Sequence, residues 1–541
     1  MTKTNDPYVM TIDVGTGSGR ALIFDGQANQ VAVAQREWIL PSLAEYPGSA
    51  VFDTEAAWSL ICECSQEALG RADIQASRIK AVTASSMREG MVLYDEQRRE
   101  IWACPNIDAR AGAEAEQLVA DGLAERIYDT AGDWLAIISP PRFRWIARHQ
   151  ADIHERMRHM SMISDWVLWR LSGELVTDPS CGSSSGLFDL RRATWSADLL
   201  SRLDLPVEIF PPVREPGTVM GQLTGEAAGQ TGLVRGTPVV VGGADTQLAL
   251  LGSGGVRAGQ LTVVGGTFWQ TAWLADQPLI DSQRRLRTLC HVLPDLWMTE
   301  GIGFLNGLAM RWLRDTVCDG VVPPAAGGEQ DMYAAMEALA EVVPPGADGV
   351  FALVSDVMNA KRWVQAPTSF LGLDLTNPQH AGERGKGVMV RAVQEGAAVT
   401  ALGHYQILKT LGGKNAAEMV FCGGASKGRL WPQIMADMFD LPVKVPKVAE
   451  TTSLGAALCG LVGIGEQASL AEAASGLVRW DRIVDPIADH VVAYRDISRQ
   501  ALNLQRGLIE WVDSGRLQAM WRGAGAVEIT AEGREQAPSN D

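Results

Sequence analysis

The residue types best suited to chemistry lie in two short glycine-rich segments, each flanked by apolar runs. Residues 8–25 contain the pattern Asp13-x-Gly15-Thr16-x-Ser18-x-Arg20, and residues 261–274 contain Gly265-Gly266-Thr267. Both segments are typical of strand-turn-strand hairpins, whose small tip residues let backbone N–H groups approach a phosphate closely. A carboxylate ending a buried strand suits magnesium, and a cation beyond the turn suits phosphate oxygens. The pair predicts a nucleotide site between two related halves.

Further polar residues follow other predicted strands. Residues 237–245 form an apolar run that ends at Asp245, where a helix over 246–251 begins. A carboxylate there is either a helix N-cap or a catalytic group. Arg88 and Glu89 also follow a strand; they could offer a donor and an acceptor to hydroxyl or carbonyl oxygens, or form an exposed ion pair. Gln247 is a weaker candidate for binding. Trp102 and Trp269 are weaker too, because tryptophan is more often a core residue.

The composition limits the class of protein. A chain of 541 residues is expected to form at least two large domains. The net charge of −17 argues against nucleic acid and anionic membrane surfaces as partners. No apolar stretch approaches the ~18 residues of a membrane span, and no signal-peptide core occurs at the start. Eight scattered cysteines without a CxxC pair fit reduced thiols. We therefore expect a soluble, cytoplasmic protein.

Strand and helix patterns alternate along the chain, which is typical of α/β domains with parallel strands covered by helices. We expect a first domain over residues 1–255, a second over 256–481, and a helical extension and tail over 482–541. Periodicity is lost after about Arg516, so residues 523–541 are predicted to be a frayed tail.

Other motifs give one rival function. Residues 412–415 lack the spaced glycine and the Ser/Thr of a Walker A loop, and Arg20 stands where a dinucleotide fingerprint requires glycine. Residues 182–186 satisfy G-x-S-x-G, which would make Ser184 the nucleophile of a serine hydrolase. The residues before this motif do not read as the buried strand that such a nucleophile needs.

Taken together, these motifs resemble the FGGY carbohydrate kinases of the actin, hexokinase and Hsp70-like ATPase superfamily. Residues 13–20 are similar to the first phosphate loop, 265–267 to the second, 240–245 to the segment ending in the catalytic aspartate, and 423–427 to the adenosine loop. The resemblance implies an α/β protein with two actin/hexokinase-like (ribonuclease H-like) ATPase domains around a nucleotide cleft.

The resemblance also implies ATP and Mg²⁺ as cofactors and a role for each site residue. Asp13 would hold Mg²⁺ through water, and Asp245 would accept the proton of the attacking hydroxyl. Arg88, Glu89, Asp245 and Gln247 would bind the substrate. The nucleotide would be bound by Gly15, Thr16, Ser18, Arg20, Gly266, Thr267, Gly423, Gly424, Ala425 and Lys427. A non-catalytic ATPase module would share both hairpins but would not need Arg88, Glu89 and Asp245 together.

Finer motifs resemble the autoinducer-2 kinases within that family. They are residues 85–90, 101–111, 162–166, 265–270 and 309–312. This implies a small hydroxylated carbonyl substrate, 4,5-dihydroxy-2,3-pentanedione, phosphorylated at its C5 hydroxyl. Glycerol, xylulose or ribulose kinase activity is the alternative. Ser355-Asp356 and the lack of a tyrosine near Ile137 depart from the sugar and glycerol kinase patterns.

Overall fold

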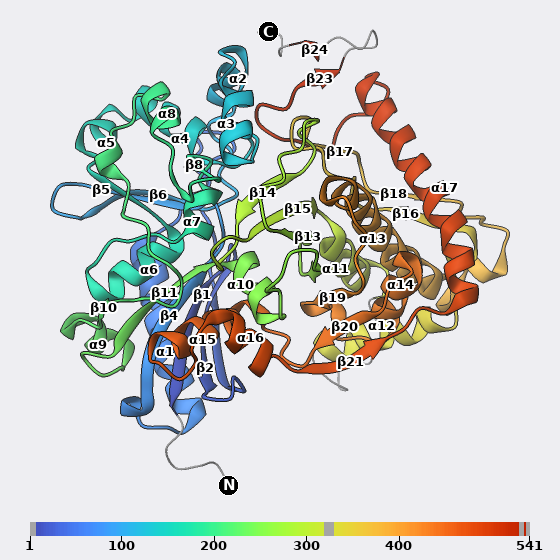
Figure 1. The fold of residues 1–541 in the computed structure, drawn as a ribbon. Coiled ribbons are helices and arrows are strands. Elements are labelled where there is room, and N and C mark those ends of the chain that lie inside the picture. Colours follow the sequence, from blue (N-terminus) through green and yellow to red (C-terminus); the bar gives the residue numbers. More distant parts are fainter. Residues whose placement is uncertain (1–6, 319–328, 530–534, 537–541) are drawn as a thin grey trace.

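The computed structural model describes residues 7–318, 329–529 and 535–536, and the chain folds into two lobes, each built on one large sheet (Figure 1). The sheet of the N-terminal lobe has six strands in the order β10-β11-β4-β1-β2-β3. Their bounds are β1 Tyr8–Val14, β2 Ser18–Asp25, β3 Gln30–Glu37, β4 Ile79–Ser86, β10 Val219–Gln222 and β11 Pro238–Ala244.

The first predicted hairpin forms the centre of this sheet. Strands β1 and β2 pair antiparallel from Tyr8↔Asp25 to Val14↔Gly19, and β3 pairs antiparallel with β2. Strands β4 and β11 then add in parallel on the other side of β1. Nearly every residue of β1 and β4 is buried, as expected for strands covered on both faces.

The sheet of the C-terminal lobe has seven strands in the order β14-β15-β13-β12-β19-β20-β21. Their bounds are β12 Leu261–Gly265, β13 Trp269–Ala275, β14 Arg287–Cys290, β15 Trp297–Gly303, β19 Met419–Cys422, β20 Val443–Pro446 and β21 Trp480–Val484. The second predicted hairpin, β12–β13, is again antiparallel, with β19 and β20 added in parallel.

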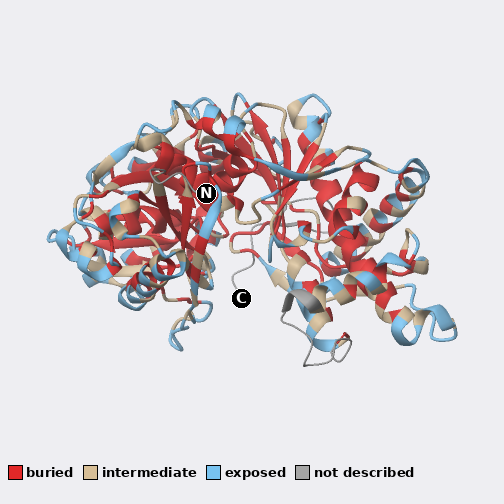
Figure 2. Ribbon diagram, turned by 90° about the horizontal axis from the view of Figure 1, so that it is seen from below, coloured by how far each residue is buried: buried red, intermediate tan, exposed pale blue. Residues whose placement is uncertain are grey.

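The two sheets share one arrangement. Each has an antiparallel meander of three strands (β1-β2-β3 and β12-β13-β15), two parallel strands (β4, β11 and β19, β20) and an antiparallel edge strand (β10 and β21). This repeated order is that of the ribonuclease H-like fold, so the predicted fold class is confirmed. Buried residues fill the interior of both lobes (Figure 2).

Helices cover the sheets and fill the space around them. In the N-terminal lobe they are α1 Thr54–Ala72, α2 Gly112–Ala120, α3 Leu123–Ala131, α4 Ser139–His149, α5 Ala151–Arg156, α6 Ile163–Ser172, α7 Pro179–Ser184, α8 Ala197–Arg202, α9 Gly225–Thr231 and α10 Asp245–Gly252. The later helices are α11 Asn306–Thr316, α12 Glu329–Glu341, α13 Gly382–Gly412, α14 Leu430–Phe439, α15 Thr451–Gly463, α16 Leu470–Leu477 and α17 Ala488–Asp513. Asp53 caps α1 by accepting a hydrogen bond from the N–H of Ala56 (3.0 Å).

Small strands complete the fold. In the N-terminal lobe β5 Met91–Tyr94 joins β6 Glu100–Cys104 and β7 His159–Met162, and β8 Phe188–Asp189 pairs with β9 Thr194–Trp195. Further on, β16 Phe351–Leu353 pairs with β18 Ser369–Leu371, β17 Val364–Gln365 with β22 Trp521–Arg522, and β23 Glu528–Ile529 with β24 Glu535–Gln536.

Helix α15 comes late in the chain but packs on the N-terminal lobe, against α10, β1, β4 and β11. Two glycines permit this close crossing. A Cβ at Gly252 would lie 2.0 Å from the carbonyl oxygen of Thr451, and a Cβ at Gly455 would lie 2.0 Å from that of Leu248. Helix α15 lies between β20 and β21 in the chain but covers the N-terminal sheet, so a division near residue 255 does not place this helix with the lobe on which it packs.

The C-terminal segment differs from its prediction. Residues 521–527 are not frayed: β22 pairs with β17, and Ala526 and Val527 are buried. The Trp134 indole donates to the carbonyl of Gly525 (2.8 Å), and the Gly523 N–H donates to the carbonyl of Trp363 (2.8 Å). The segment therefore contacts both lobes. Residues 530–534 and 537–541 of the predicted tail lie outside the described residues.

In the described part of the chain, no helix is both long enough and apolar enough to cross a membrane.

Candidate active site

The tip of the first hairpin is closed by a backbone hydrogen bond and supported by neighbouring loops. The Gly15 N–H donates to the carbonyl of Ser18 (2.9 Å). The hydroxyl of Thr16 donates to Oδ1 of Asn106 (3.0 Å), a residue of the 101–111 motif to which no role was assigned. The Trp38 indole donates to the carbonyl of Thr16 (3.0 Å). The turn is thus held in place, and an acceptor on another molecule would have to compete with Asn106 for the Thr16 hydroxyl.

Asp13 and Arg20 face each other across β1 and β2, close to the tip of this hairpin. Ser85 donates its hydroxyl to Oδ1 of Asp13 (2.6 Å), and Nη2 of Arg20 lies 3.3 Å from Oδ2. Nη1 of Arg20 lies 2.5 Å from Oε2 of Glu450, the residue before α15. The pKa of Arg20 is raised, chiefly by the charge of Asp13. The predicted phosphate-binding cation is therefore already paired with two carboxylates.

The second hairpin borders a cavity of about 600 Å³ in the C-terminal lobe. Five residues predicted to bind nucleotide line it together: Gly266, Thr267, Gly424, Ala425 and Lys427. Gly423, the first residue of the predicted adenosine loop, has a φ of +86° and does not line the cavity itself. The size and the mixed lining suit a small-molecule ligand. The structure thus brings the second phosphate loop and the predicted adenosine loop to one cavity.

The other walls of this cavity were not predicted. They include Gly307, Met310, Arg311, Tyr333, Met336 and Trp431. The Gly307 N–H donates to the carbonyl of Thr267 (3.1 Å), so the start of α11 supports the tip of the second hairpin. A Cβ at Gly307 would lie 2.1 Å from the carbonyl oxygen of Gly266. The local signals for this wall were the glycine at the start of α11 and the 309–312 motif, which contains Met310 and Arg311.

Asp245 begins α10 directly after β11, as predicted. Its Oδ1 accepts from the N–H of Thr246 (2.6 Å) and the hydroxyl of Thr246 (3.2 Å), and its side chain is 36% exposed. Nε of Arg88 lies 3.7 Å from the same oxygen. Removal from bulk water raises the pKa of Asp245 to about 6; Arg88 opposes that shift, and the charges of Asp13 and Glu89 add to it. A carboxylate with such a pKa is suited to accept a proton near neutral pH.

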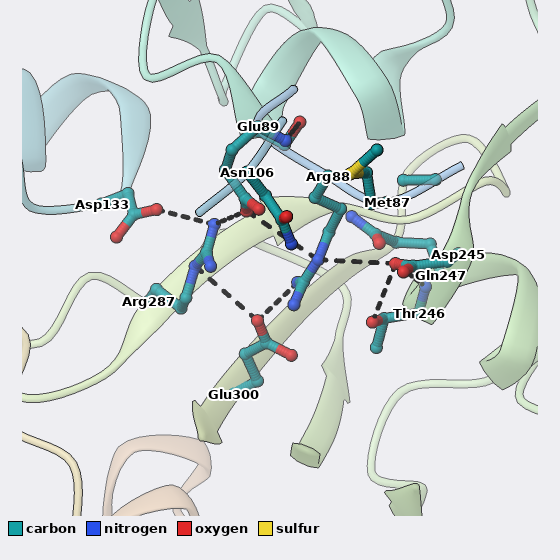
Figure 3. Close-up of polar contacts among 12 residues, drawn as sticks. Met87, Arg88, Glu89, Asn106, Asp133, Asp245, Thr246, Gln247, Arg287 and Glu300 are labelled. Carbon is teal, nitrogen blue, oxygen red and sulfur yellow. Dashed lines mark hydrogen bonds and ion pairs between the residues drawn. The ribbon is translucent and has the colours of Figure 1, made fainter. Parts of the chain in front are cut away.

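Arg88 and Glu89 lie in a buried cluster of charges beside Asp245 (Figure 3). Nη1 of Arg88 lies 2.5 Å from Oε1 of Glu300, and Nη2 of Arg287 lies 2.5 Å from Oε1 of Glu89 and 2.7 Å from Oδ2 of Asp133. Their side chains are at most 5% exposed, so the alternative of an exposed ion pair is excluded. Burial raises the pKa of Asp133 to about 6, against the opposing charge of Arg287.

Sequence reasoning missed three members of this cluster. Arg287 lies in β14 and Glu300 in β15, and Asp133 follows α3. Apart from Arg287 and Glu300, the residues of β14 and β15 are apolar or small. A charge in such a strand needs a buried partner, so the sequence did contain a signal for both residues. Which partner it finds depends on the packing of the two lobes.

The weaker candidates for substrate binding were Gln247, Trp102 and Trp269. Gln247 is fully buried beside Asp245, and its amide donates to the carbonyl of Cys290 (3.3 Å). Trp102 is half-buried, with the Arg110 guanidinium 5.5 Å from its ring. Trp269, the first residue of β13, is buried and packs on Trp431 (centroids 4.9 Å apart), so it is a core residue.

The G-x-S-x-G motif lies in and just beyond the short helix α7, and Ser184 is fully buried. Its hydroxyl donates to the carbonyl of Cys181 (2.8 Å), one turn back in the same helix. A serine hydrolase needs a strand that leads to an exposed nucleophile, and this position has a helix and a buried serine instead. The structure therefore does not support the serine hydrolase alternative.

The carboxylate of Asp13 is chemically suited to bind Mg²⁺, as predicted from the sequence. Within the described ranges, only Asp165, Asp178 and Cys181 bring three potential ligand atoms within 4.8 Å of one another, and all three are buried. Mg²⁺ with a nucleotide usually takes one or two carboxylates, phosphate oxygens and water. A single buried carboxylate at the end of β1 is therefore a sufficient protein ligand.

Comparison with known proteins gives a consistent result. Residues 8–252 match the model of the N-terminal domain of the FGGY family of carbohydrate kinases, and residues 262–464 match that of its C-terminal domain. The chain is 40% identical over 527 residues to the autoinducer-2 kinase of Yersinia enterocolitica (97% of this chain, 99% of the relative). It is 42% identical over 521 residues to that of Salmonella typhimurium (96% and 98%). A crystal structure of xylulose kinase from Rhodospirillum rubrum is similar, with a TM-score of 0.79 and 26% identity, over 93% of this chain and 99% of that one.

Proposed function

This chain belongs to the FGGY family of carbohydrate kinases, and from that premise we propose that it phosphorylates 4,5-dihydroxy-2,3-pentanedione at its C5 hydroxyl, with ATP as donor. The observation that carries the proposal is the meeting of Asp245 with the buried Arg88–Glu89 pair (Figure 3). It supplies a proton acceptor with a pKa of about 6 beside a donor and an acceptor of hydrogen bonds. The relatives named autoinducer-2 kinase favour this substrate.

The donor side of the reaction would use the two hairpins. Backbone N–H groups at the two hairpin tips would hold the phosphates, apart from those of Gly15 and Gly266, which donate within the tips. The 600 Å³ cavity beyond Thr267 would take the nucleoside. Phosphoryl transfer depends on positioning and on charge stabilisation, so backbone amides and cations supply most of the effect. Asp13 would hold Mg²⁺, which neutralises charge on the phosphate oxygens.

The acceptor side would use Asp245 as the general base. Its carboxylate takes the proton of the C5 hydroxyl while that oxygen forms a bond to the γ-phosphorus. The bond between the γ-phosphorus and the β–γ bridging oxygen breaks, and ADP leaves with the bond's electron pair. Arg88 would donate to the carbonyl oxygens of the substrate, and Glu89 would accept from a hydroxyl. An ATP-dependent reaction also fits the expected cytoplasmic location.

Selectivity over polyols would come from the mismatch of polar groups. An acceptor whose carbonyl and hydroxyl oxygens are placed differently leaves a buried donor or acceptor of the site unpaired, which costs about 1–3 kcal/mol per buried group. Ser355 and Asp356, which depart from the sugar kinase pattern, hydrogen-bond to Phe304 and Ala366. The selectivity is therefore assigned to the residues around Asp245.

A coupled assay of ADP release tests the proposal. The purified chain is assayed with ATP, Mg²⁺ and one acceptor: 4,5-dihydroxy-2,3-pentanedione, glycerol, xylulose or ribulose. We expect kcat/KM for the dicarbonyl to exceed the others by at least about tenfold, and phosphorus NMR to place the phosphate on C5. ATP turnover without acceptor is the control. A preference for glycerol or a pentulose would overturn the substrate and leave the kinase reaction standing.

A further inference from the structure

Both acceptor-site side chains of the N-terminal lobe are paired with opposite charges from the C-terminal sheet. Arg88 lies 2.5 Å from Glu300 of β15, and Glu89 lies 2.5 Å from Arg287 of β14. Nε of Arg287 also lies 3.6 Å from Oε1 of Glu300, so the two pairs are joined in one network (Figure 3). Each lobe thus contributes one cation and one anion to the pairs.

Strand β14 is fixed against the N-terminal lobe along its length. The N–H of Thr288 donates to the carbonyl of Gly132 (2.9 Å), and the N–H of Cys290 donates to the hydroxyl of Ser183 (3.0 Å). The hydroxyl of Tyr128 donates to the carbonyl of Leu286, just before the strand. Arg287 therefore reaches Glu89 from a strand whose position relative to the N-terminal lobe is set by several hydrogen bonds.

Glu89 needs this support because its backbone is strained. Its φ is +62°, a left-handed conformation that non-glycine residues rarely adopt. Arg142 donates to the carbonyl of Glu89, and Arg287 holds the carboxylate. A residue kept in such a conformation persists only when its surroundings fix it, so loss of either contact would let the Glu89 side chain move.

Glu300 controls where Arg88 points. The guanidinium approaches Glu300 by Nη1 at 2.5 Å, whereas its Nε stays 3.7 Å from Asp245 and 3.9 Å from Glu89. Without Glu300, the buried guanidinium would close on the nearest remaining carboxylate, because an unpaired buried charge is costly. Asp245 and Glu89 are those carboxylates. Glu300 thus keeps Arg88 from forming a direct ion pair with the proposed base.

We propose that Arg287 and Glu300 are positioning residues for the acceptor site, acting across the lobe boundary on Glu89 and Arg88. The inference rests on the proposed function, in which Arg88 and Glu89 bind the acceptor. Asp133 is the outer member of the network: it lies 2.7 Å from Arg287, which links it to Glu89. The C-terminal lobe therefore takes part in binding the acceptor as well as the nucleotide.

The test compares acceptor and nucleotide parameters in four variants: Glu300→Gln, Glu300→Asp, Arg287→Gln and Arg287→Lys. We expect the glutamine variants to raise the KM of the acceptor by about tenfold or more, with nucleotide affinity, measured by calorimetry without acceptor, changed less than about twofold. Arg287→Lys should recover part of the loss, since lysine keeps the positive charge but lacks the fork of the guanidinium that contacts both Glu89 and Glu300.

A matched control removes a buried charge from the same lobe at another place. Glu395→Gln breaks the buried pair of Glu395 with Arg391 (2.8 Å) and leaves the Arg287–Glu300 network intact. We expect it to lower the melting temperature without changing the KM of the acceptor. An Asp133→Asn, Arg287→Gln double-mutant cycle should show coupling in the KM of the acceptor, because Asp133 acts through Arg287.

The outcomes separate this inference from the proposed function. Unchanged acceptor KM in variants whose melting temperature falls as in Glu395→Gln would overturn the inference. So would equal losses in acceptor KM and nucleotide affinity. If the glutamine variants do not fold, Glu300→Asp and Arg287→Lys decide in the same way. If the wild-type chain prefers another acceptor, the proposed substrate fails, and the variants are measured with the acceptor that the wild type prefers.

Discussion

The indole of Trp521 stacks on the ring of Phe304, with centroids 4.9 Å apart and planes 18° apart. Phe304 in turn contacts Phe268, whose centroid lies 5.0 Å away and whose backbone closes the tip of the second hairpin. The C-terminal segment thus reaches the second phosphate loop through one aromatic neighbour.

From this contact we expect Trp521→Ala to affect both stability and nucleotide binding. Loss of the stacked ring should lower the free energy of unfolding by about 2 kcal/mol and let Phe304 and the hairpin tip move. The KM of ATP should then rise about threefold or more. Trp511→Ala, which removes a 53% exposed indole from α17, is the control. Equal, small effects in both variants would contradict a role for the C-terminal segment.

The ordering of this segment could not be predicted from its residues. Residues 521–527 have neither helical nor strand periodicity, and their partners, such as Trp134, Trp363 and Phe304, are more than 150 residues away in the chain. The hairpins, in contrast, were predictable because their strands and turns are local patterns. The long-range contacts of residues 521–527 follow only from the packing of both lobes.

Asp245→Asn should separate chemistry from binding. The amide keeps the shape of the side chain but cannot accept the proton, so kcat should fall by at least about 10² with ATP affinity nearly unchanged. The variant should also be more stable near pH 7, because folding raises the pKa of Asp245 from 3.8 to about 6 and so disfavours its ionised form. The shift is worth up to about 3 kcal/mol. Because the side chain is 36% exposed, solvent screening reduces the expected gain to about 1 kcal/mol. Near wild-type turnover would show that Asp245 is not the base.

The pH profile gives an independent measure of the same group. A base must be ionised, so kcat/KM should fall about tenfold per pH unit below the pKa of about 6 and level off above it. The direction follows from burial, which favours the protonated form more than Arg88 opposes it. Initial rates between pH 5 and 8 at limiting acceptor measure the profile. A rate that stays constant down to pH 5 would contradict the raised pKa.

The site was predictable in unequal parts. Asp13, Arg20, Asp245 and the residues of both glycine-rich tips stand at strand ends, where the local pattern marks them. Arg287 and Glu300 were missed because a lone charge in a strand indicates that a buried partner exists but does not identify that partner. Their significance comes from lying opposite Glu89 and Arg88, a relation between residues about 200 positions apart.

Gly307→Ala should damage the nucleotide site through the second hairpin. The new Cβ would lie 2.1 Å from the carbonyl oxygen of Gly266, so the hairpin tip or the start of α11 must move. We expect the KM of ATP to rise about tenfold or more with little change in the KM of the acceptor. Gly476→Ala, at a helical position with no atom within 4 Å of the added Cβ, is the control. Unchanged ATP kinetics would show that this contact does not shape the nucleotide site.

The two carboxylates that share Arg20 should have opposite effects when neutralised. Glu450 lies 2.5 Å from Nη1 of Arg20 and is 34% exposed, whereas Asp13 lies 3.3 Å from Nη2 and is nearly buried. If Arg20 contacts the nucleotide phosphates, Glu450 competes for it, and Glu450→Gln should tighten ADP binding by about two- to fivefold, the modest effect of a partly exposed pair.

Asp13→Asn removes the proposed magnesium ligand, so the Mg²⁺ concentration for half-maximal rate should rise about tenfold or more. Calorimetry of ADP binding with and without Mg²⁺, together with magnesium titrations of the rate, measures both effects. Tighter ADP binding in Asp13→Asn at saturating Mg²⁺ would show that Asp13 competes with the phosphates for Arg20. Weaker ADP binding in Glu450→Gln would show that Glu450 supports nucleotide binding, and either result would contradict these assignments.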